Sequence, residues 1–325
     1  MQTQERTDSS KGAPRPCVVA DGPLDETVLG FMANRVELLP WDTTPAAAKS
    51  VEGIYTYGHP LVDGAILDRF PALKVVSNYG VGVDHIRLAD AAARGIPVGN
   101  TPGILDGATA DMGFALLLAS ARLIVRGDRY ARSAEFLHYY PGLMLGREVH
   151  GSTLGIIGLG SIGSQVARRA RAFDMKVLYC NRTRREAAER ELGVVYVPFE
   201  TLLEQSDYVM LCCPLTPQTV GMIGAEQFRR MKPTATLVNI ARGAVVKTGD
   251  LCEALQKGEI AAAALDVTEP EPLPRDHPLL RLENLTIVPH LGSATVETRR
   301  EMARISVENL MAGLAGKPLL HAVRK

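Results

Sequence analysis

The stretch Thr153–Gly163 constrains the fold more than any other part of the chain. It begins with a short apolar run typical of a buried parallel strand, passes through three glycines and continues into a segment of helical periodicity. With this spacing, Gly158 makes the tight turn, Gly160 lets the backbone approach a pyrophosphate, and Gly163 lets helix and strand pack closely. The N-terminus of the following helix favours a phosphate. Because strand and helix flank the glycines as the motif requires, we predict a dinucleotide site rather than a purely steric turn.

The overall composition excludes several classes of function. A length of 325 residues allows about two domains. Lys and Arg (36) balance Asp and Glu (36), which argues against a nucleic acid or an anionic membrane as the partner. No apolar run reaches membrane-spanning length. The five cysteines have neither the pattern of a disulfide framework nor metal-ligand spacing, so we expect reduced thiols, no metal site and a cytoplasmic protein. Residues 1–16 are polar and lack a signal-peptide core, and we expect a disordered tail there.

From Cys17 onward, short apolar runs alternate with helix-length amphipathic segments, which is typical of an α/β protein with a parallel sheet. Strands are expected at residues 17–20, 51–55, 73–77, 96–98, 153–157, 176–180, 208–212, 235–240, 261–265 and 285–288. Helices are expected at residues 61–70, 86–93, 110–126, 165–173 and 294–313. Asp106 or Thr109 can cap the long apolar helix at 110–126.

The residues after the predicted strand at 176–180 bear on the choice of cofactor. An NAD site usually has an acidic residue here for the ribose 2′-hydroxyl, whereas this chain has Asn181, Arg182, Thr183, Arg184 and Arg185. Arginines attract a 2′-phosphate, and the guanidinium fork fits phosphate geometry. We therefore predict NADPH over NADH. The alternative is a solvated charge run at a helix start, where cations would oppose the helix dipole.

Several later strands end in polar turns. Ligands of open α/β sheets bind outside the carboxyl ends of the strands, so these turns could surround one crevice. The polar residues concerned are Arg242, Asp266, Glu269, Glu271 and His290. An earlier loop, Gly80-Val81-Gly82, follows another predicted strand, and its backbone amides could face a small anion. A plain glycine turn is an equally good interpretation of that loop.

Four segments together resemble the D-isomer-specific 2-hydroxyacid dehydrogenases, most closely the glyoxylate/hydroxypyruvate reductases. They are Gly155–Gly163, Asn239-Ile-Ala-Arg-Gly243, Leu265–Pro272 and Pro289–Ala294. The resemblance implies NADPH-dependent reduction of small 2-keto acids to D-2-hydroxy acids by hydride transfer. Glyoxylate, hydroxypyruvate and 2-ketogluconate are the candidate substrates. Relatives often carry tryptophans in the segment matching residues 130–150, but the only tryptophan here is Trp41, which leaves hydroxypyruvate preference open.

The resemblance also implies a role for individual residues. Arg242 matches the arginine that holds the substrate carboxylate and keto oxygen, His290 matches the acid/base, and Glu271 matches its carboxylate partner. Substrate-binding positions are matched by Val81, Gly82, Arg242, Asp266 and Ser293. Cofactor-binding positions are matched by Gly158, Leu159, Gly160, Ser161, Ile162, Gly163, Asn181, Arg182, Thr183, Arg184, Pro214, Ile240, Asp266 and Gly292, with Thr109 as a further candidate.

The family fold implies a Rossmann dinucleotide-binding domain at residues 109–292, inserted into a flavodoxin-like substrate-binding domain formed by residues 17–108 and 293–325. Family members are usually homodimers, in which the segment at residues 130–150 reaches toward the partner subunit. A second function remains open, because NAD(P)-sensing corepressors share this fold and keep the matched arginine, glutamate and histidine. Fold alone does not choose between an enzyme and a binding module.

Overall fold

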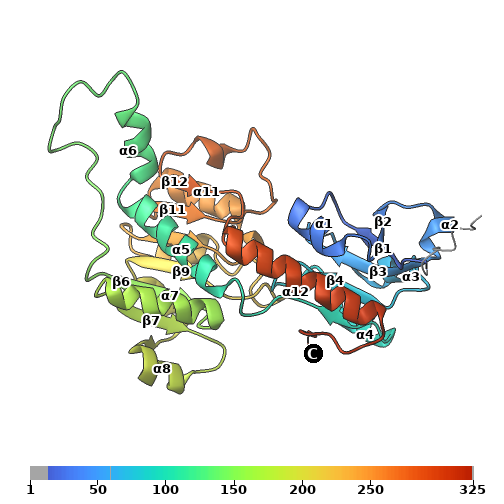
Figure 1. Ribbon diagram of the computed structural model, residues 1–325. Coiled ribbons are helices and arrows are strands. Elements are labelled where there is room, and N and C mark those ends of the chain that lie inside the picture. Colours follow the sequence, from blue (N-terminus) through green and yellow to red (C-terminus); the bar gives the residue numbers. More distant parts are fainter. Residues whose placement is uncertain (1–13, 59, 324–325) are drawn as a thin grey trace, which may run out of the picture. The chain divides into compact units, whose positions relative to one another are not determined.

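The computed structural model describes residues 14–58 and 60–323, which form two α/β units (Figure 1). The chain passes from the first unit to the second between Pro102 and Gly103 and returns between Arg299 and Arg300. The boundaries expected from the sequence were 108/109 and 292/293. Residues 1–13 of the predicted tail lie outside the described residues, and residues 14–16 precede the first strand without regular structure.

The first unit is built on a five-stranded parallel sheet with the order β2-β1-β3-β4-β5, which is the flavodoxin-like order. Its strands are β1 (Cys17–Ala20), β2 (Glu37–Pro40), β3 (Val51–Thr56), β4 (Val75–Asn78) and β5 (Val98–Gly99). Its helices are α1 (Glu26–Met32), α2 (Pro45–Ala48), α3 (Gly64–Asp68), α4 (Leu88–Ala93) and the greater part of α12 (Val296–Leu314). One core contains α2, α3 and α4, and the other contains α1 and α12, so both faces of the sheet are covered.

The second unit is built on a seven-stranded parallel sheet with the order β12-β11-β10-β9-β6-β7-β8. Counted from β6, the first six strands follow the Rossmann order 3-2-1-4-5-6, with β12 added at the edge. The strands are β6 (Thr153–Ile157), β7 (Lys176–Cys180), β8 (Val195–Tyr196), β9 (Tyr208–Leu211), β10 (Thr236–Asn239), β11 (Ala262–Leu265) and β12 (Leu285–Ile287). The two sheets confirm the predicted fold class, with the Rossmann unit inserted into the flavodoxin-like one.

Helices cover both faces of the seven-stranded sheet. One core joins α5 (Asp106–Ala121), α7 (Ser161–Ala172) and α8 (Glu186–Leu192), and the other joins α9 (Phe199–Gln205), α10 (Ala225–Arg230) and α11 (Thr248–Lys257). Two short 3-10 turns, η1 (Gly243–Val245) and η2 (Pro278–Arg281), complete the unit. Strand order reverses between β6 and β9, and a ligand crevice is expected at the carboxyl ends of these strands.

The helix predicted at residues 110–126 is two helices, so that prediction was wrong. α5 ends at Ala121, Leu123 adopts a left-handed conformation (φ 54°), and α6 (Ile124–Ala131) continues at an angle of 60°. The predicted cap was also wrong, because the N-cap of α5 is Leu105 and makes no side-chain capping bond. Among the described residues, no single helix has the length and apolar character to span a membrane. Only this bent pair meets both criteria jointly, on length and composition alone.

The segment that follows α6 runs away from the sheet of its own unit as a long loop, drawn in green in Figure 1. Residues 134–149 contain no helix or strand. Several large apolar side chains are exposed here, including Leu137 (82%), Tyr139 (80%) and Leu145 (77%). α6 itself buries no residue. Within this chain, therefore, the loop has little apolar packing of its own.

Candidate active site

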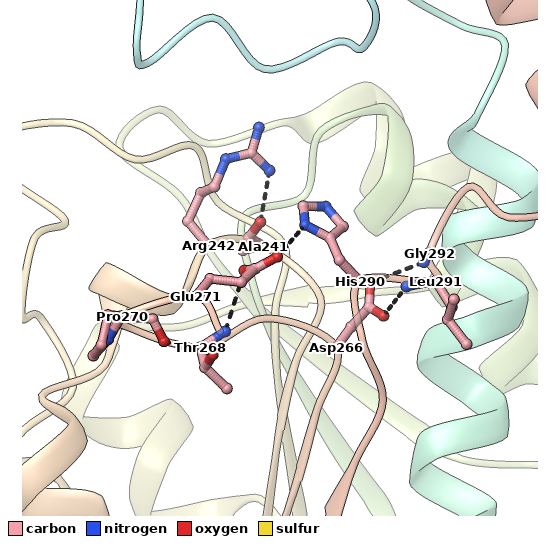
Figure 2. A network of polar contacts seen from close by, with 9 residues as sticks. All are labelled: Ala241, Arg242, Asp266, Thr268, Pro270, Glu271, His290, Leu291 and Gly292. Carbon is pink, nitrogen blue, oxygen red and sulfur yellow. Dashed lines mark hydrogen bonds and ion pairs between the residues drawn. The ribbon is translucent and has the colours of Figure 1, made fainter. Parts of the chain in front are cut away.

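Three neighbouring strands of the second unit end in the polar residues singled out by the sequence. Arg242 lies beyond the end of β10, Asp266 directly follows β11, and His290 lies beyond the end of β12. Because β10, β11 and β12 are adjacent and parallel, their carboxyl ends lie at the same edge of the sheet. Figure 2 shows the three side chains in one polar network with Glu271, which the loop after β11 contributes.

His290 and Glu271 form a direct pair. His290 Nδ1 lies 2.7 Å from Glu271 Oε1, and the backbone N–H of Thr268 donates to Glu271 Oε2 (3.4 Å). The side chains are 34% and 41% exposed, respectively, so solvent reaches both. Glu269, the other glutamate of this loop, makes no such contact within the described part of the chain, and its backbone carbonyl accepts a hydrogen bond from the Thr248 hydroxyl. The structure therefore pairs the imidazole with the glutamate that the sequence favoured.

Asp266 fixes the turn that carries His290. Its carboxylate accepts from the N–H groups of Leu291 (2.6 Å) and Gly292 (2.9 Å), and its carbonyl accepts from the N–H of His290 (2.9 Å). Burial raises the pKa of Asp266, and these backbone bonds partly oppose that shift. His290 itself adopts a left-handed conformation (φ 55°), which costs a non-glycine residue about 1–2 kcal/mol. A strained backbone held by several bonds is typical of a functional position.

The turn that carries Arg242 is braced by Asn239, a residue the sequence analysis did not single out as functional. Its side chain donates to the carbonyl of Arg242 (3.0 Å) and accepts from the N–H of Ala241 (3.0 Å). Arg242 Nη1 also donates to the carbonyl of Ala241 (2.9 Å). A Cβ atom at Gly243 would overlap the carbonyl of Thr268, so this turn packs directly on the loop that bears the glutamate. No signal in the sequence marks this brace, because the burial of Asn239 is visible only in the structure.

The glycine turn after β6 has the form that a dinucleotide requires. Gly158 has a φ of +99°, and a Cβ there would lie 2.6 Å from the backbone nitrogen of Cys213. A Cβ at Gly163 would overlap the carbonyl of Gly158, whereas a Cβ at Gly160 meets no atom within 4 Å. No side chain caps α7, whose N-terminal N–H groups follow this open position. The turn is therefore packed at its first and third glycines and open at the second, where a pyrophosphate would approach.

The loop between β7 and α8 is tied to the glycine turn. Asn181 Oδ1 accepts from the N–H of Leu159 (2.7 Å), and Arg185 donates to the carbonyl of Leu159 (2.9 Å). Arg184 makes two bonds of 2.8 Å to Glu189, and this guanidinium lowers the pKa of Glu189 to about 2. Arg182 and Thr183 are exposed on the same loop. The uncharged Asn181 thus stands directly after β7, and the loop presents cations rather than carboxylates.

The remaining candidate residues of the second unit lie at the ends of its elements. Gly292 lies next to Thr109 of α5: a Cβ at this glycine would be 3.3 Å from the threonine methyl group. Ile240 is buried directly after β10, and Pro214 is exposed after β9. Ser293 follows Gly292 and is partly exposed. Ser161 and Ile162 form the first turn of α7.

Val81 and Gly82 belong to the first unit, in the loop after β4. Both are partly exposed. Over residues 14–58 and 60–323, no group of three or more His, Cys, Asp or Glu side chains is arranged to hold a metal ion.

Comparison with known proteins places these observations in a family. Residues 114–292 match the family model described as the D-isomer specific 2-hydroxyacid dehydrogenase, NAD binding domain. The chain belongs to this family. It is therefore a D-2-hydroxyacid dehydrogenase, an oxidoreductase with an NAD-binding domain of Rossmann type. The matched range contains the glycine turn, Arg242, Asp266, Glu271 and His290.

Similar dehydrogenases carry more specific names. The glyoxylate reductase of Korarchaeum cryptofilum is 52% identical over 312 residues, covering 93% of this chain and 94% of that protein. The glyoxylate reductase of Pyrococcus furiosus is 46% identical over 283 residues, covering 86% and 84%. Among solved structures, the NADPH-dependent glyoxylate/hydroxypyruvate reductase of Sinorhizobium meliloti, in complex with NADP and malonate, is 33% identical, covers 95% of this chain and 97% of its own, and has a TM-score of 0.87.

Proposed function

We propose that this dehydrogenase reduces glyoxylate and related small 2-keto acids, including hydroxypyruvate and 2-ketogluconate, to D-2-hydroxy acids with NADPH. The observation that carries the proposal is the 2.7 Å contact between His290 and Glu271, at the edge of the sheet where Arg242 also lies. An imidazole paired with a carboxylate is suited to give a proton, and a guanidinium is suited to bind a carboxylate. The names of the similar glyoxylate reductases support the same substrate class.

Each polar side chain then has one task. Arg242 binds the substrate carboxylate and polarises the keto oxygen. With Nδ1 held by Glu271, His290 presents its proton to that oxygen from Nε2, and Glu271 stabilises the protonated imidazole. Asp266 orients the histidine through the turn that it holds. When bound, NADPH would supply the hydride for the carbonyl carbon, and the proton from His290 on the oxygen completes the reduction of the carbonyl to an alcohol.

The preference for NADPH is proposed from the loop after β7. Arg182 and Thr183 are exposed beside the glycine turn, and Asn181 stands where a carboxylate would repel a 2′-phosphate. The similar Sinorhizobium meliloti reductase is named as NADPH-dependent and was solved with NADP. In this proposal the second unit binds the cofactor, and Val81 and Gly82 of the first unit contribute to substrate binding.

We also propose that the protein is a homodimer. The loop after α6 exposes Leu137, Tyr139 and Leu145 by more than three quarters, and the solvent-facing α6 adds Ile124 (53%). Exposed apolar side chains gathered in one segment favour an interface with another chain. Light scattering of the purified protein tests this directly: a mass near 70 kDa is expected, twice the 35.1 kDa of one chain.

The test of the catalytic proposal is a kinetic panel. The wild-type protein is assayed with glyoxylate, hydroxypyruvate and 2-ketogluconate, each with NADPH and with NADH. We expect turnover with a lower Michaelis constant for NADPH. A His290→Ala variant should lose about 10²- to 10⁴-fold in kcat, the usual contribution of a general acid, whereas Arg242→Ala should also raise the KM for the keto acid. Folded variants with full turnover would contradict these roles.

A further inference from the structure

The loop after β4 turns three consecutive carbonyl groups toward amide side chains. Asn78 Nδ2 donates to the carbonyls of Gly80 (3.0 Å) and Gly82 (2.9 Å). Asn100 Nδ2 donates to the carbonyl of Val81 (2.9 Å), and the N–H of Thr101 donates to that of Gly80 (3.0 Å). All three carbonyls are therefore held by donors from the ends of β4 and β5.

This arrangement dictates where the N–H groups of the loop point. In a planar trans peptide, the carbonyl of one residue and the N–H of the next point in opposite directions. Carbonyls held inward at Gly80, Val81 and Gly82 therefore turn the N–H groups of Val81, Gly82 and Val83 outward. Within the described residues, none of these three N–H groups donates to a protein acceptor. Successive backbone N–H groups of this kind form a concave site for an anion.

Asn78 is the side chain that controls this geometry most directly. It is fully buried at the last position of β4, and one amide nitrogen serves two of the three carbonyls. Its Oδ1 has no hydrogen-bond partner in the described structure, so the bonds of Nδ2 alone fix the amide. The opposite amide orientation would place Oδ1 against the carbonyls of Gly80 and Gly82, and two acceptors would face each other.

We propose that Asn78 is a positioning residue for substrate binding: it holds the loop so that the N–H groups of Val81 and Gly82 receive the carboxylate of a 2-keto acid. The inference rests on the proposed function for the identity of the anion. Asn78 is buried behind the loop and acts on the substrate through the loop backbone. A chain with another residue here would keep the same glycines and lose the orientation of their amides.

Two substitutions test the proposal, together with a matched control. Asn78→Asp keeps the shape but replaces the donor by an acceptor, and Asn78→Ser removes the reach of the amide with less risk to folding. The control is Asn284→Ser in the second unit, because Asn284 Nδ2 likewise donates to two carbonyls, those of Leu255 and Ala261 (both 3.2 Å). All three variants are first checked for folding by thermal melts.

The expected result is a selective loss of substrate affinity. In both Asn78 variants the KM for glyoxylate should rise about 10- to 100-fold, as for the loss of one or two hydrogen bonds to a charged group. In the Asn78 variants the KM for NADPH and the kcat should change less than about threefold. Asn284→Ser should match the wild type in the KM for glyoxylate, the KM for NADPH and the kcat. A folded Asn78→Ser variant with wild-type KM for glyoxylate would overturn the proposal, as would an equal rise in the control.

Binding of oxalate separates this inference from the proposed function. Oxalate presents a carboxylate and is no 2-keto acid substrate, so its dissociation constant can be measured by calorimetry without turnover. We expect weaker oxalate binding in both Asn78 variants and unchanged binding in Asn284→Ser. If the wild type reduced no 2-keto acid yet bound oxalate in an Asn78-dependent way, the proposed function would fail and the role of Asn78 would stand. Equal oxalate affinity in wild type and Asn78→Ser would refute the positioning role.

Discussion

Replacing Glu271 by glutamine tests the histidine pair with the smallest change of shape. The substitution keeps the side-chain volume and removes the negative charge 2.7 Å from His290 Nδ1. A hydrogen bond between charged groups contributes about 1.5–3 kcal/mol. Because the two side chains are 34% and 41% exposed, solvent screening reduces the energy of this hydrogen bond to about 1–2 kcal/mol. If that energy stabilises the protonated imidazole in the transition state, kcat falls about 5- to 30-fold.

The assay is the steady-state kcat for glyoxylate at saturating NADPH, measured for wild type and variant at one fixed pH. In the proposed mechanism His290 gives a proton to the carbonyl oxygen, and the Glu271 carboxylate holds the ring through Nδ1. Without that carboxylate, kcat should fall in Glu271→Gln, because the imidazole that gives the proton loses its partner. The matched control is Glu269→Gln, which removes the same charge from the same loop without touching the imidazole.

The two variants together test whether the contact between Glu271 and His290 contributes to turnover. If Glu271→Gln kept wild-type turnover, the pair would have no catalytic role. An equal loss in Glu269→Gln would show that the loop acts through its net charge and not through the contact with His290. A loss confined to substrate KM would assign Glu271 to binding, because a proton-transfer role must reduce kcat.

Three further predictions address cofactor, fold and pH. In steady-state kinetics, Arg182→Ala should raise the KM for NADPH at least about tenfold, because only NADPH carries the 2′-phosphate. The KM for NADH should stay within about twofold of the wild-type value. Gly163→Ala should lower the free energy of unfolding by about 1–3 kcal/mol in denaturant titrations, because its Cβ would overlap the carbonyl of Gly158. Burial raises the pKa of Asp266, so the folded state binds a proton more readily than the unfolded state. The stability of wild type relative to Asp266→Asn should therefore decrease as pH rises from about 4 to 7, which melts at several pH values would measure.

The sequence predicts the central strands of the second unit closely because these strands are buried, whereas it misses β8, a partly exposed edge strand of two residues. The strand at 176–180 coincides with β7, and those at 208–212 and 235–240 contain β9 and β10. β2 was missed because it is a mostly exposed edge strand of the first unit without a continuous buried run. The break between α5 and α6 was missed because Leu123 is a leucine in a left-handed conformation, and nothing in an apolar pattern marks that backbone state.

The position of candidate site residues was predictable where polar side chains follow the ends of strands. Arg242, Asp266 and His290 met that condition, Glu271 lies in the loop after β11, and the sheet order brings these strands together. The supporting amides were not predictable in this way. Asn78 and Asn239 act through backbone groups of their own turns, and a lone asparagine at a strand end has no spacing that distinguishes a brace from a surface residue.

The chemistry of the site depends on backbone orientation as much as on charged side chains. Asp266 fixes the N–H groups of the turn at Leu291 and Gly292, as Asn78 fixes the carbonyls after β4. In both cases a buried polar side chain at the end of a strand sets the direction of several peptide groups in the next loop. In both loops these hydrogen bonds therefore set the orientation of the peptide groups. Substitution of a brace should therefore impair substrate binding or proton transfer even when every side chain that touches the substrate is retained.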